Sequence, residues 1–161
     1  MSPAEYNLSV DAFSDGLFRF ALKHVKDRDT ANDMVQEAYT RLWEKHAGVD
    51  YQKVKSYLFT TVYHLVIDRS KQMQRTQPIE KSHHLHQVKE KPFLGLQQIL
   101  HKALDTLPEI QKTLILLRDY EGYNYEEMGK ITGLSESQVK VYIYRGRVAL
   151  KEYIGKLEHV L

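Results

Sequence analysis

The sequence predicts an all-α fold in which two small helical domains are joined by a flexible linker, the C-terminal one containing a helix-turn-helix. Apolar residues recur at three- and four-residue spacing along most of the chain, as on the buried face of a helix. No segment alternates apolar and polar residues for long enough to indicate a sheet. The stretch from Thr76 to Pro92 carries Pro78 and three lysines and has no apolar period. We therefore expect domains at residues 1–75 and 93–161 with a linker at 76–92.

Three helices are expected in the first domain. The first runs from about Asp11 to Lys26. The second begins at Thr30, with Asp33 three residues later in a capping pattern. A surface loop from Glu44 to Tyr51 precedes the third helix, which runs from about Val54 to Gln74. The expected apolar faces consist of Phe18, Ala21, Leu22 and Val25, of Met34, Val35, Ala38, Leu42 and Trp43, and of Leu58, Val62, Leu65 and Val66.

In the second domain, an amphipathic helix begins near Leu96 and stops at Pro108. Pro108 can itself open the next helix, which extends to Gly122. The segment from Tyr123 to Arg147 then has the pattern of two short helices folded about one glycine turn. We interpret it as a helix-turn-helix.

Local chemistry supports this turn. Gly133 supplies a position where a positive φ is cheap, and Leu134 fills the inside of the turn. Ser135 opens the second helix, because its hydroxyl can accept a backbone bond from Gln138 while Gln138 reaches back. Gly129 allows close helix packing at a cost of up to roughly 1 kcal/mol in helix propensity.

The second helix of this motif presents a cationic and partly aromatic surface. A recognition helix lies in the major groove of DNA, with side chains near its start at base edges and other polar groups on phosphates. The base-facing candidates are Lys140, Val141, Tyr144 and Arg145, and the phosphate-facing candidates are Ser137, Gln138 and Arg147. The alternative interpretation of this stretch alone is a plain helical hairpin with a solvated basic face.

Composition limits the possible functions. The chain has 161 residues, of which 42% are hydrophobic, and it contains no cysteine, which excludes disulfides, thiolate zinc sites and cysteine nucleophiles. No apolar run is long enough to span a bilayer, and Met1 to Asp15 lacks a secretory signal pattern, so we expect a cytoplasmic protein. Net charge is −3 over residues 1–50, +5 over 51–91, −2 over 92–134 and +2 over 135–161. Such segregation is expected of a chain that contacts both DNA and a protein.

Two separated blocks resemble one known family, the sigma factors of bacterial RNA polymerase, and specifically its compact extracytoplasmic-function group. The stretch from Asp33 to Trp43 is similar to the family's core-binding helix. Val54 to Arg69 resembles its promoter-melting helix, and Leu104 to Glu109 followed by the helix-turn-helix resembles the domain that reads the upstream promoter element. The resemblance implies sigma domain 2 at residues 1–75 and sigma domain 4 at residues 93–161.

The resemblance also implies roles for individual residues. Those that would bind the core polymerase are Asp33, Gln36, Glu37, Arg41 and Trp43. Those that would contact the opened −10 element of the promoter are Tyr51, Tyr57, Thr61, His64, Arg69 and Lys71. The helix-turn-helix candidates would read the −35 element. Trp43 could instead complete the first domain's core, and from its apolar spacing we expect it there.

The chain departs from the family pattern at three positions. Many relatives have an arginine and an asparagine in the melting helix where this chain has Thr60 and His64, and Gly129 stands where they usually have alanine. The recognition helix is also rich in tyrosine, and Tyr142 and Tyr144 suggest methyl or sugar contacts in place of some arginine ones, so the preferred promoter sequence is not carried over. The resemblance implies core RNA polymerase, promoter DNA and an anti-sigma protein, often a membrane sensor, as partners.

The sequence is also compatible with another class of protein. The main alternative to a sigma factor is a dimeric helix-turn-helix regulator with an N-terminal sensing or partner-binding domain. An enzyme is not expected, because the chain has no Gly-rich phosphate loop, nucleophile elbow or carboxylate pair in an apolar stretch. His83, His84 and His86 could ligate a metal, but their spacing does not fit a helix-borne site, so no metal or cofactor is expected.

Overall fold

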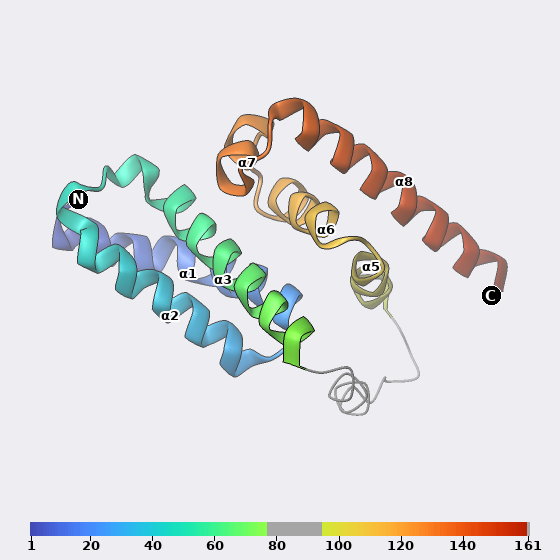
Figure 1. Ribbon diagram of the computed structural model, residues 1–161, viewed down its shortest axis with the longest axis horizontal. Coiled ribbons are helices and arrows are strands. Elements are labelled where there is room, and N and C mark those ends of the chain that lie inside the picture. Colours follow the sequence, from blue (N-terminus) through green and yellow to red (C-terminus); the bar gives the residue numbers. More distant parts are fainter. Residues whose placement is uncertain (77–94, 161) are drawn as a thin grey trace.

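The computed structural model describes residues 1–76 and 95–160 (Figure 1). The predicted linker at 76–92, with His83, His84 and His86, therefore lies outside the described residues except at its first position. Every regular element in the described ranges is a helix, arranged as two helical groups on either side of this gap. The all-α prediction is confirmed.

The first half is a three-helix bundle of α1 (Pro3–Val25), α2 (Arg28–Lys45) and α3 (Val54–Thr76). Of two short 3₁₀ turns, η1 (His46–Gly48) lies in the predicted surface loop of Glu44 to Tyr51, and η2 (Tyr51–Lys53) begins at its last residue. The largest fully buried side chains of this half come from all three helices. They are Leu17, Phe20, Leu42, Leu58 and Phe59.

Two helix starts differ from the prediction. α1 begins eight residues before Asp11, because Ser2 and Glu5 form a capping box. α2 is capped by Asp27, whose carboxylate accepts from the Thr30 amide at 3.2 Å, so Thr30 lies within the first turn and is not the cap. In both cases a polar cap fixes the helix start, and the apolar period begins only later.

The second half contains α5 (Leu96–Asp105), α6 (Glu109–Ile115), the π-helical turn η3 (Leu116–Tyr120), α7 (Tyr125–Thr132) and α8 (Glu136–Val160). Pro108 is the N-cap residue of α6, as the sequence predicts. Among the largest buried side chains here are Leu114, Leu117, Met128, Ile131 and Ile143.

The helix-turn-helix forms as predicted. Gly133 ends α7 with φ +80°. The Ser135 hydroxyl accepts from the Gln138 amide at 3.2 Å, and the Gln138 side chain accepts from the Ser135 amide at 3.0 Å. A second capping box, between Asn124 and Glu127, begins α7. These caps fix the angle at which α8 leaves the turn.

Gly129 lies where the turn passes over α7. A Cβ atom at this position would stand 2.8 Å from the carbonyl oxygen of Leu134, which belongs to the backbone and cannot rotate away. Gly155, in contrast, has open space around its Cβ position on α8. The glycine at 129 is therefore required by packing, although glycine is a poor helix former.

We expect Gly129→Val to lower the free energy of unfolding by roughly 2 kcal/mol or more, because the turn must move to admit the side chain. Gly155→Val is the matched control and should change stability by less than about 0.5 kcal/mol. Urea denaturation followed by circular dichroism measures both. Equal effects of the two substitutions would contradict the packing role of Gly129.

The two halves pack directly against each other, through α3 and α7 above all. The ring of Tyr123, 2% exposed, meets Phe59 edge-on at 5.4 Å. Lys55 donates to the backbone carbonyl of Glu121 at 3.4 Å, and the Glu121 carboxylate binds Arg19 with two hydrogen bonds of 3.0 and 3.2 Å. We call this packing of α1 and α3 on α5 to α7 the closed arrangement.

Gly16 fits this arrangement. It lies in the interior of α1, where glycine costs roughly 1 kcal/mol relative to alanine. A Cβ atom there would stand 2.9 Å from the Oε1 atom of Glu121 in the other half. The missing side chain makes room for the carboxylate that binds Arg19.

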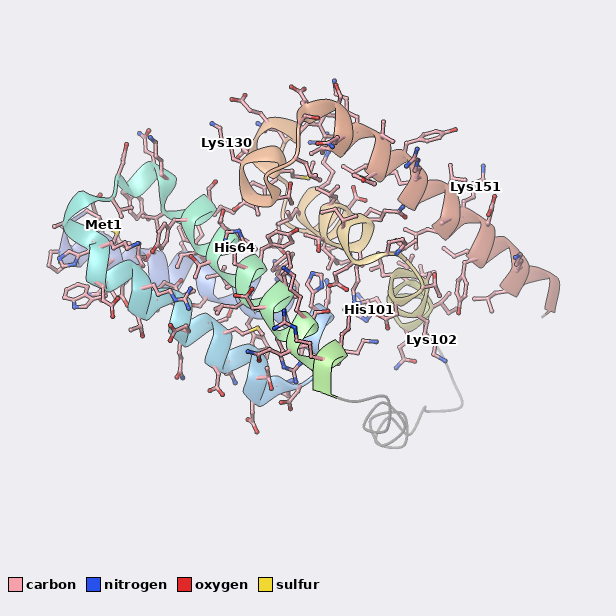
Figure 2. The ribbon with its side chains drawn as sticks, in the orientation of Figure 1. Met1, His64, His101, Lys102, Lys130 and Lys151 are labelled. Carbon is pink, nitrogen blue, oxygen red and sulfur yellow. The ribbon has the colours of Figure 1, made fainter. Side chains whose placement is uncertain are left out.

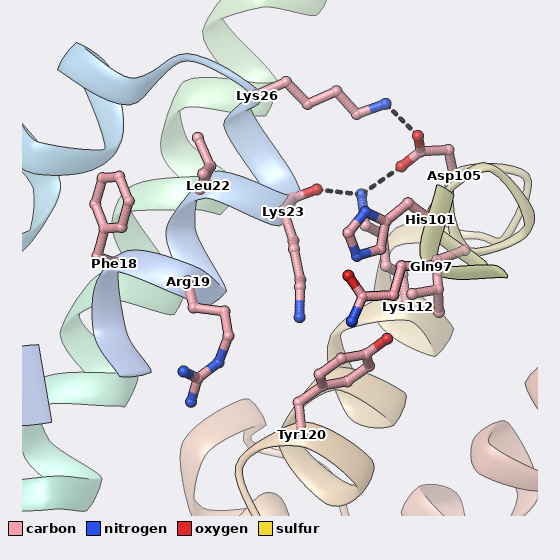
Figure 3. A pocket seen from close by; sticks show the side chains of 11 residues that line it. Phe18, Arg19, Leu22, Lys23, Lys26, Gln97, His101, Asp105, Lys112 and Tyr120 are labelled. Atoms are coloured by element: carbon pink, nitrogen blue, oxygen red, sulfur yellow. Dashed lines mark hydrogen bonds and ion pairs between the residues drawn. The ribbon is translucent and has the colours of Figure 1, made fainter. Parts of the chain in front are cut away.

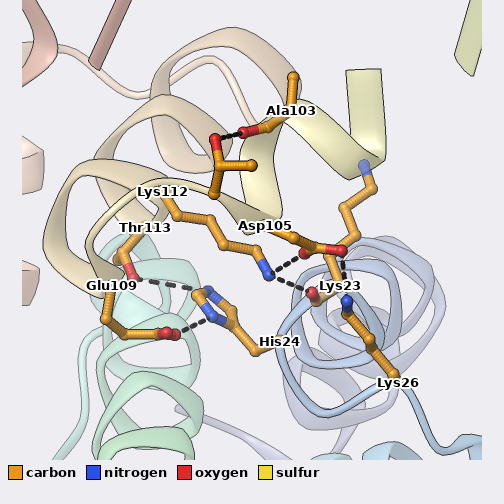
Figure 4. Close-up of polar contacts among 9 residues, drawn as sticks. Lys23, His24, Lys26, Ala103, Asp105, Glu109, Lys112 and Thr113 are labelled. Carbon is orange, nitrogen blue, oxygen red and sulfur yellow. Dashed lines mark hydrogen bonds and ion pairs between the residues drawn. The ribbon is translucent and has the colours of Figure 1, made fainter. Parts of the chain in front are cut away.

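A polar cluster completes the contact (Figure 4). The Lys112 ammonium, whose residue is 6% exposed, donates to the carbonyl oxygen of Lys23 at 2.6 Å and to Asp105 at 2.9 Å. Lys26 also binds Asp105. The fully buried side chain of His24 lies between Glu109, which binds its Nδ1 atom, and the Thr113 hydroxyl, 3.5 Å from its Nε2 atom.

This cluster makes the closed arrangement sensitive to acid. Burial lowers the pKa of His24 from its ordinary value of 6.5, and the hydrogen bond from His24 lowers the pKa of Glu109 from 4.5. A histidine with a lowered pKa favours the folded contact above pH 6.5 and disfavours it as the pH falls; a carboxylate with a lowered pKa loses its contribution below 4.5. Lys112 also opposes the protonation of His24, whereas Glu109 and Asp105 favour it.

We expect the halves to separate as the pH falls from 7.5 to 5.5, seen as an increase in the radius of gyration in small-angle X-ray scattering. His24→Gln, which keeps a donor but does not titrate, should abolish most of the change within this window. A radius that is constant in the wild-type chain, or one that increases equally in the variant, would contradict this role of His24.

Candidate functional site

The predicted recognition surface is exposed on α8. Val141 is 45% exposed and Tyr144 70% exposed, and Lys140 and Arg145 are also exposed. Val139, Ile143 and Gly146 face inward. The N-terminal part of α8 thus presents the four base-facing candidates together on its outer surface. Ser137, Gln138 and Arg147 are exposed on the same helix.

The cations of this surface have partners that DNA phosphates could replace. Arg147 binds Asp119 at 2.9 Å, with both side chains nearly half exposed. Lys140 lies 3.5 Å from Glu136 and 5.6 Å from the centre of the Tyr125 ring. Exposed ion pairs of this kind contribute only about 0–1 kcal/mol, so exchanging them for phosphates costs little.

The candidates for the −10 side are distributed along η2 and α3. His64 and Lys71 are exposed, and Tyr51, Tyr57 and Arg69 are half-buried. Thr61 differs, since it is 8% exposed and its hydroxyl donates to the carbonyl oxygen of Tyr57 at 2.9 Å. In the closed arrangement Thr61 therefore lies within the protein, away from solvent. Figure 2 shows His64 midway along α3, and Lys130 and Lys151 on α7 and α8.

The candidates for polymerase binding share the outer face of α2. Asp33, Gln36, Glu37, Arg41 and Trp43 are all exposed, and Arg41 donates to Glu37 at 2.9 Å. The mixture of carboxylates, one arginine and one large aromatic ring is typical of a protein-binding surface more than of a DNA-binding one.

Trp43 is not a core residue, and our expectation that it completes the core is wrong. It is 44% exposed. Its ring stacks on His46 at 4.1 Å with an angle of 11° between the planes, and meets Tyr6 edge-on at 5.0 Å. Helical spacing alone cannot distinguish an inward ring from one at the edge of the apolar face.

Tyr6 and His46 were not predicted as site residues. Tyr6 is held by a hydrogen bond of 3.2 Å from its hydroxyl to the carbonyl oxygen of Tyr39, and the Nδ1 atom of His46 bonds to the Trp43 carbonyl oxygen. We call Tyr6, Trp43 and His46 the aromatic cluster. Tyr6 lies in the part of α1 that precedes the predicted start at Asp11, where no sequence pattern indicates a helix beside α2.

Two further observations concern other classes of site. In residues 1–76 and 95–160, no three histidine, aspartate or glutamate side chains are grouped so that they could hold a metal ion. No helix in the same ranges combines the length and apolarity needed to cross a membrane.

Comparison with known proteins identifies both halves. Residues 10–76 match the family model described as Sigma-70 region 2, and residues 97–150 match Sigma-70, region 4. RNA polymerase sigma factor SigV of Bacillus subtilis is 33% identical over 142 residues, covering 86% of this chain and 84% of the relative. ECF RNA polymerase sigma factor SigX of the same species is 26% identical over 97% of this chain and 87% of the relative.

The fold is also similar to those of proteins in two solved complexes. RpoE from Bartonella quintana, solved in complex with the anti-sigma factor NepR, has a TM-score of 0.72 at 22% identity and covers 93% of this chain and 96% of its own. CnrH, solved with the cytosolic domain of CnrY, has a TM-score of 0.69 at 18% identity, covering 94% and 88%. With SigV sharing a third of its residues across both halves, this chain belongs to the sigma factors of RNA polymerase, in their extracytoplasmic-function group.

Proposed function

We propose a division of labour between the two halves of this alternative sigma factor, which directs core RNA polymerase to specific promoters. The outer face of α2, with the aromatic cluster, binds the polymerase. The α8 surface reads the −35 element, and η2 and α3 hold the opened strand of the −10 element. The exposure of Lys140, Val141, Tyr144 and Arg145 together on α8 carries this proposal.

The DNA contacts follow from the side chains at each place. Arg145 and Lys140 can donate to base edges or phosphates, while Val141 and the Tyr144 ring can contact thymine methyl groups. On the −10 side, Tyr51 and Tyr57 offer rings on which unpaired bases stack, a contact that does not require a full base code.

We further propose that polymerase carries out the chemistry, that this chain acts in the cytoplasm where polymerase is found, and that an anti-sigma protein controls it. One solved structure with the same fold is a complex of the sigma factor RpoE with the anti-sigma factor NepR, and another is a complex of CnrH with the cytosolic domain of CnrY. The domain boundaries at 75 and 93 belong to the same proposal. They lie at the edges of the two family matches.

Run-off transcription with core polymerase on a library of promoter sequences tests this function and reads the specificity at once. We expect transcripts from a small promoter set only when core polymerase and this chain are both present. A chain that fails to bind core polymerase and yet occupies a palindromic operator by itself would be the dimeric regulator that we considered as the alternative.

A further inference from the structure

A pocket of about 800 Å³ lies between the two halves (Figure 3). Its volume is within the range of about 300–1,000 Å³ that small-molecule sites usually have. One wall comes from the C-terminal part of α1, and the other comes from α5, α6 and η3. The charged and polar residues of the lining include Arg19, Lys23, Lys26, His101, Lys112 and Tyr120.

The lining carries more positive than negative charge. Four of its residues are lysines or arginines, against the single carboxylate of Asp105. That carboxylate is already bound to both Lys26 and Lys112. Arg19 points into the pocket from α1, and its partner Glu121 is not part of the lining.

Lys23 is the cation least compensated by the protein. Its ammonium lies 3.3 Å from the centre of the Tyr120 ring, and within the described parts of the chain no carboxylate forms an ion pair with it. Figure 3 shows its side chain extending across the pocket toward Tyr120. A ring face attracts a cation but leaves the charge unneutralised.

Two titratable groups of the lining are harder to protonate than in water. Burial is the main reason that the pKa of Lys23 is lowered to about 8, with a further decrease from Arg19 that Glu121 partly opposes. Burial likewise lowers the pKa of His101, with contributions from Lys23, Lys112 and Lys26 that Asp105 partly opposes. A bound anion would raise the pKa of both groups, because an opposite charge within a few ångströms favours the protonated form.

The pocket lining also contains apolar groups on both walls. Phe18 and Leu22 belong to α1, and Leu104 and the ring of Tyr120 belong to the other wall. A ligand that satisfies both the cations and the apolar groups needs at least two negative charges and a flat or apolar body of moderate size. Inorganic ions satisfy only the first condition, and neutral ring compounds satisfy only the second.

We propose that this pocket binds a small phosphorylated organic anion of about nucleotide size. Its phosphates contact Lys23, Arg19 and His101, and its apolar body lies against Phe18 and Leu22. A flexible lysine ammonium and an arginine fork are both suited to phosphate oxygens.

Binding at this pocket has a conformational consequence. The lining combines α1 with α5, α6 and η3, so the site is complete only in the closed arrangement. A ligand that binds one of two states shifts the population toward that state by its difference in affinity. The anion therefore holds the halves together and opposes the separate placement of the two DNA-reading surfaces; this second consequence rests on the proposed function.

Isothermal titration of the full chain at 150 mM salt tests the site with three probes: ADP, inorganic pyrophosphate and adenosine. We expect ADP to bind more tightly than either of the others, since it alone satisfies both the cations and the apolar groups of the pocket. Lys23→Gln should weaken ADP binding at least tenfold. This substitution keeps the Lys23 carbonyl that accepts from Lys112, and of the described contacts between the halves it removes that of the Lys23 ammonium with the Tyr120 ring.

Lys45→Gln is the matched control, because it removes one exposed lysine on α2, remote from the pocket lining, and should leave ADP binding unchanged. His101→Gln provides a second variant if Lys23→Gln does not fold, with at least threefold weaker binding expected. Absence of ADP binding up to 10 mM, or equal losses from Lys23→Gln and Lys45→Gln, would overturn the site.

A separate measurement follows the closure itself. The chain has no cysteine, so Glu44→Cys and Lys151→Cys place two fluorescent labels uniquely, one on each half. At pH 6.5, where the halves have begun to separate, ADP at its dissociation constant for the chain that retains Lys23 should raise energy transfer between the labels. After Lys23→Gln, at least tenfold more ADP should be needed for the same rise. ADP binding without a change in transfer would refute the coupling. Because both assays use the chain alone, their failure is distinct from a failure to direct transcription.

Discussion

Replacement of Trp43 by alanine is expected to weaken binding to core RNA polymerase by about tenfold to a hundredfold, or roughly 1.4–2.8 kcal/mol. Tryptophan is enriched among the residues that contribute most to protein interfaces, and the Trp43 ring is already oriented by stacking on His46 and by the edge of Tyr6. A ring held in one orientation loses little entropy on binding. The measurement is a titration of labelled core polymerase with the purified chain.

The fold should survive this substitution, because Trp43 is nearly half exposed. Thermal unfolding checks that. Leu96→Ala is the matched control: it removes a large hydrophobic side chain, 71% exposed, from α5 and should leave polymerase binding unchanged. Trp43→Phe should recover part of the lost affinity. Unaltered binding by Trp43→Ala would remove the aromatic cluster from the proposed polymerase surface.

Arg145→Ala is expected to cost roughly 1–3 kcal/mol on the preferred promoters, a loss of about 5-fold to 150-fold, and to relax the choice of base at one position of the −35 element. Arg145 is exposed on α8 beside Tyr144, which is the most exposed large hydrophobic residue among those described on that helix. An arginine in this place can bind one guanine edge with two hydrogen bonds. The run-off assay on the promoter library measures both affinity and specificity.

The control for Arg145 is Lys151→Ala, which removes an exposed cation farther along the same helix. A phosphate contact or a general attraction to DNA weakens all templates alike. If Lys151→Ala and Arg145→Ala lower transcription equally and without change of sequence preference, Arg145 does not read bases.

The helix-turn-helix was predictable because its signals are local. Gly133, Ser135 and Gln138 act through bonds to their immediate neighbours, and the structure forms each of them. The start of α1 was not predictable from the sequence, because Leu8 is 57% exposed and disturbs the apolar pattern in the first turns of this helix. A helix held by a cap and by contacts with another helix has a weaker signature in sequence than one with a continuous buried stripe.

The residues proposed to bind polymerase and promoter were predictable only through resemblance to a family, because exposed charged residues do not recur at a regular spacing as buried apolar residues do. The closed arrangement could not be predicted from the sequence. Lys112 reads as an ordinary surface lysine of α6, yet it is almost fully buried against the Lys23 carbonyl. Contacts between residues 80 or more positions apart leave no pattern in the sequence, because neither partner depends on its neighbours in the chain.

The glycine at position 16 makes the middle of α1 a reporter of the separation of the two halves. With Glu121 seated over it, the middle of the helix is shielded; once the carboxylate leaves, the same turn is the part of α1 with the least intrinsic helix propensity. Exchange of the amide hydrogens of that turn with solvent deuterium should then accelerate in step with each opening event. The rate of deuterium uptake around residue 16 thus reports how often the two halves separate, and the measurement needs no fluorescent label.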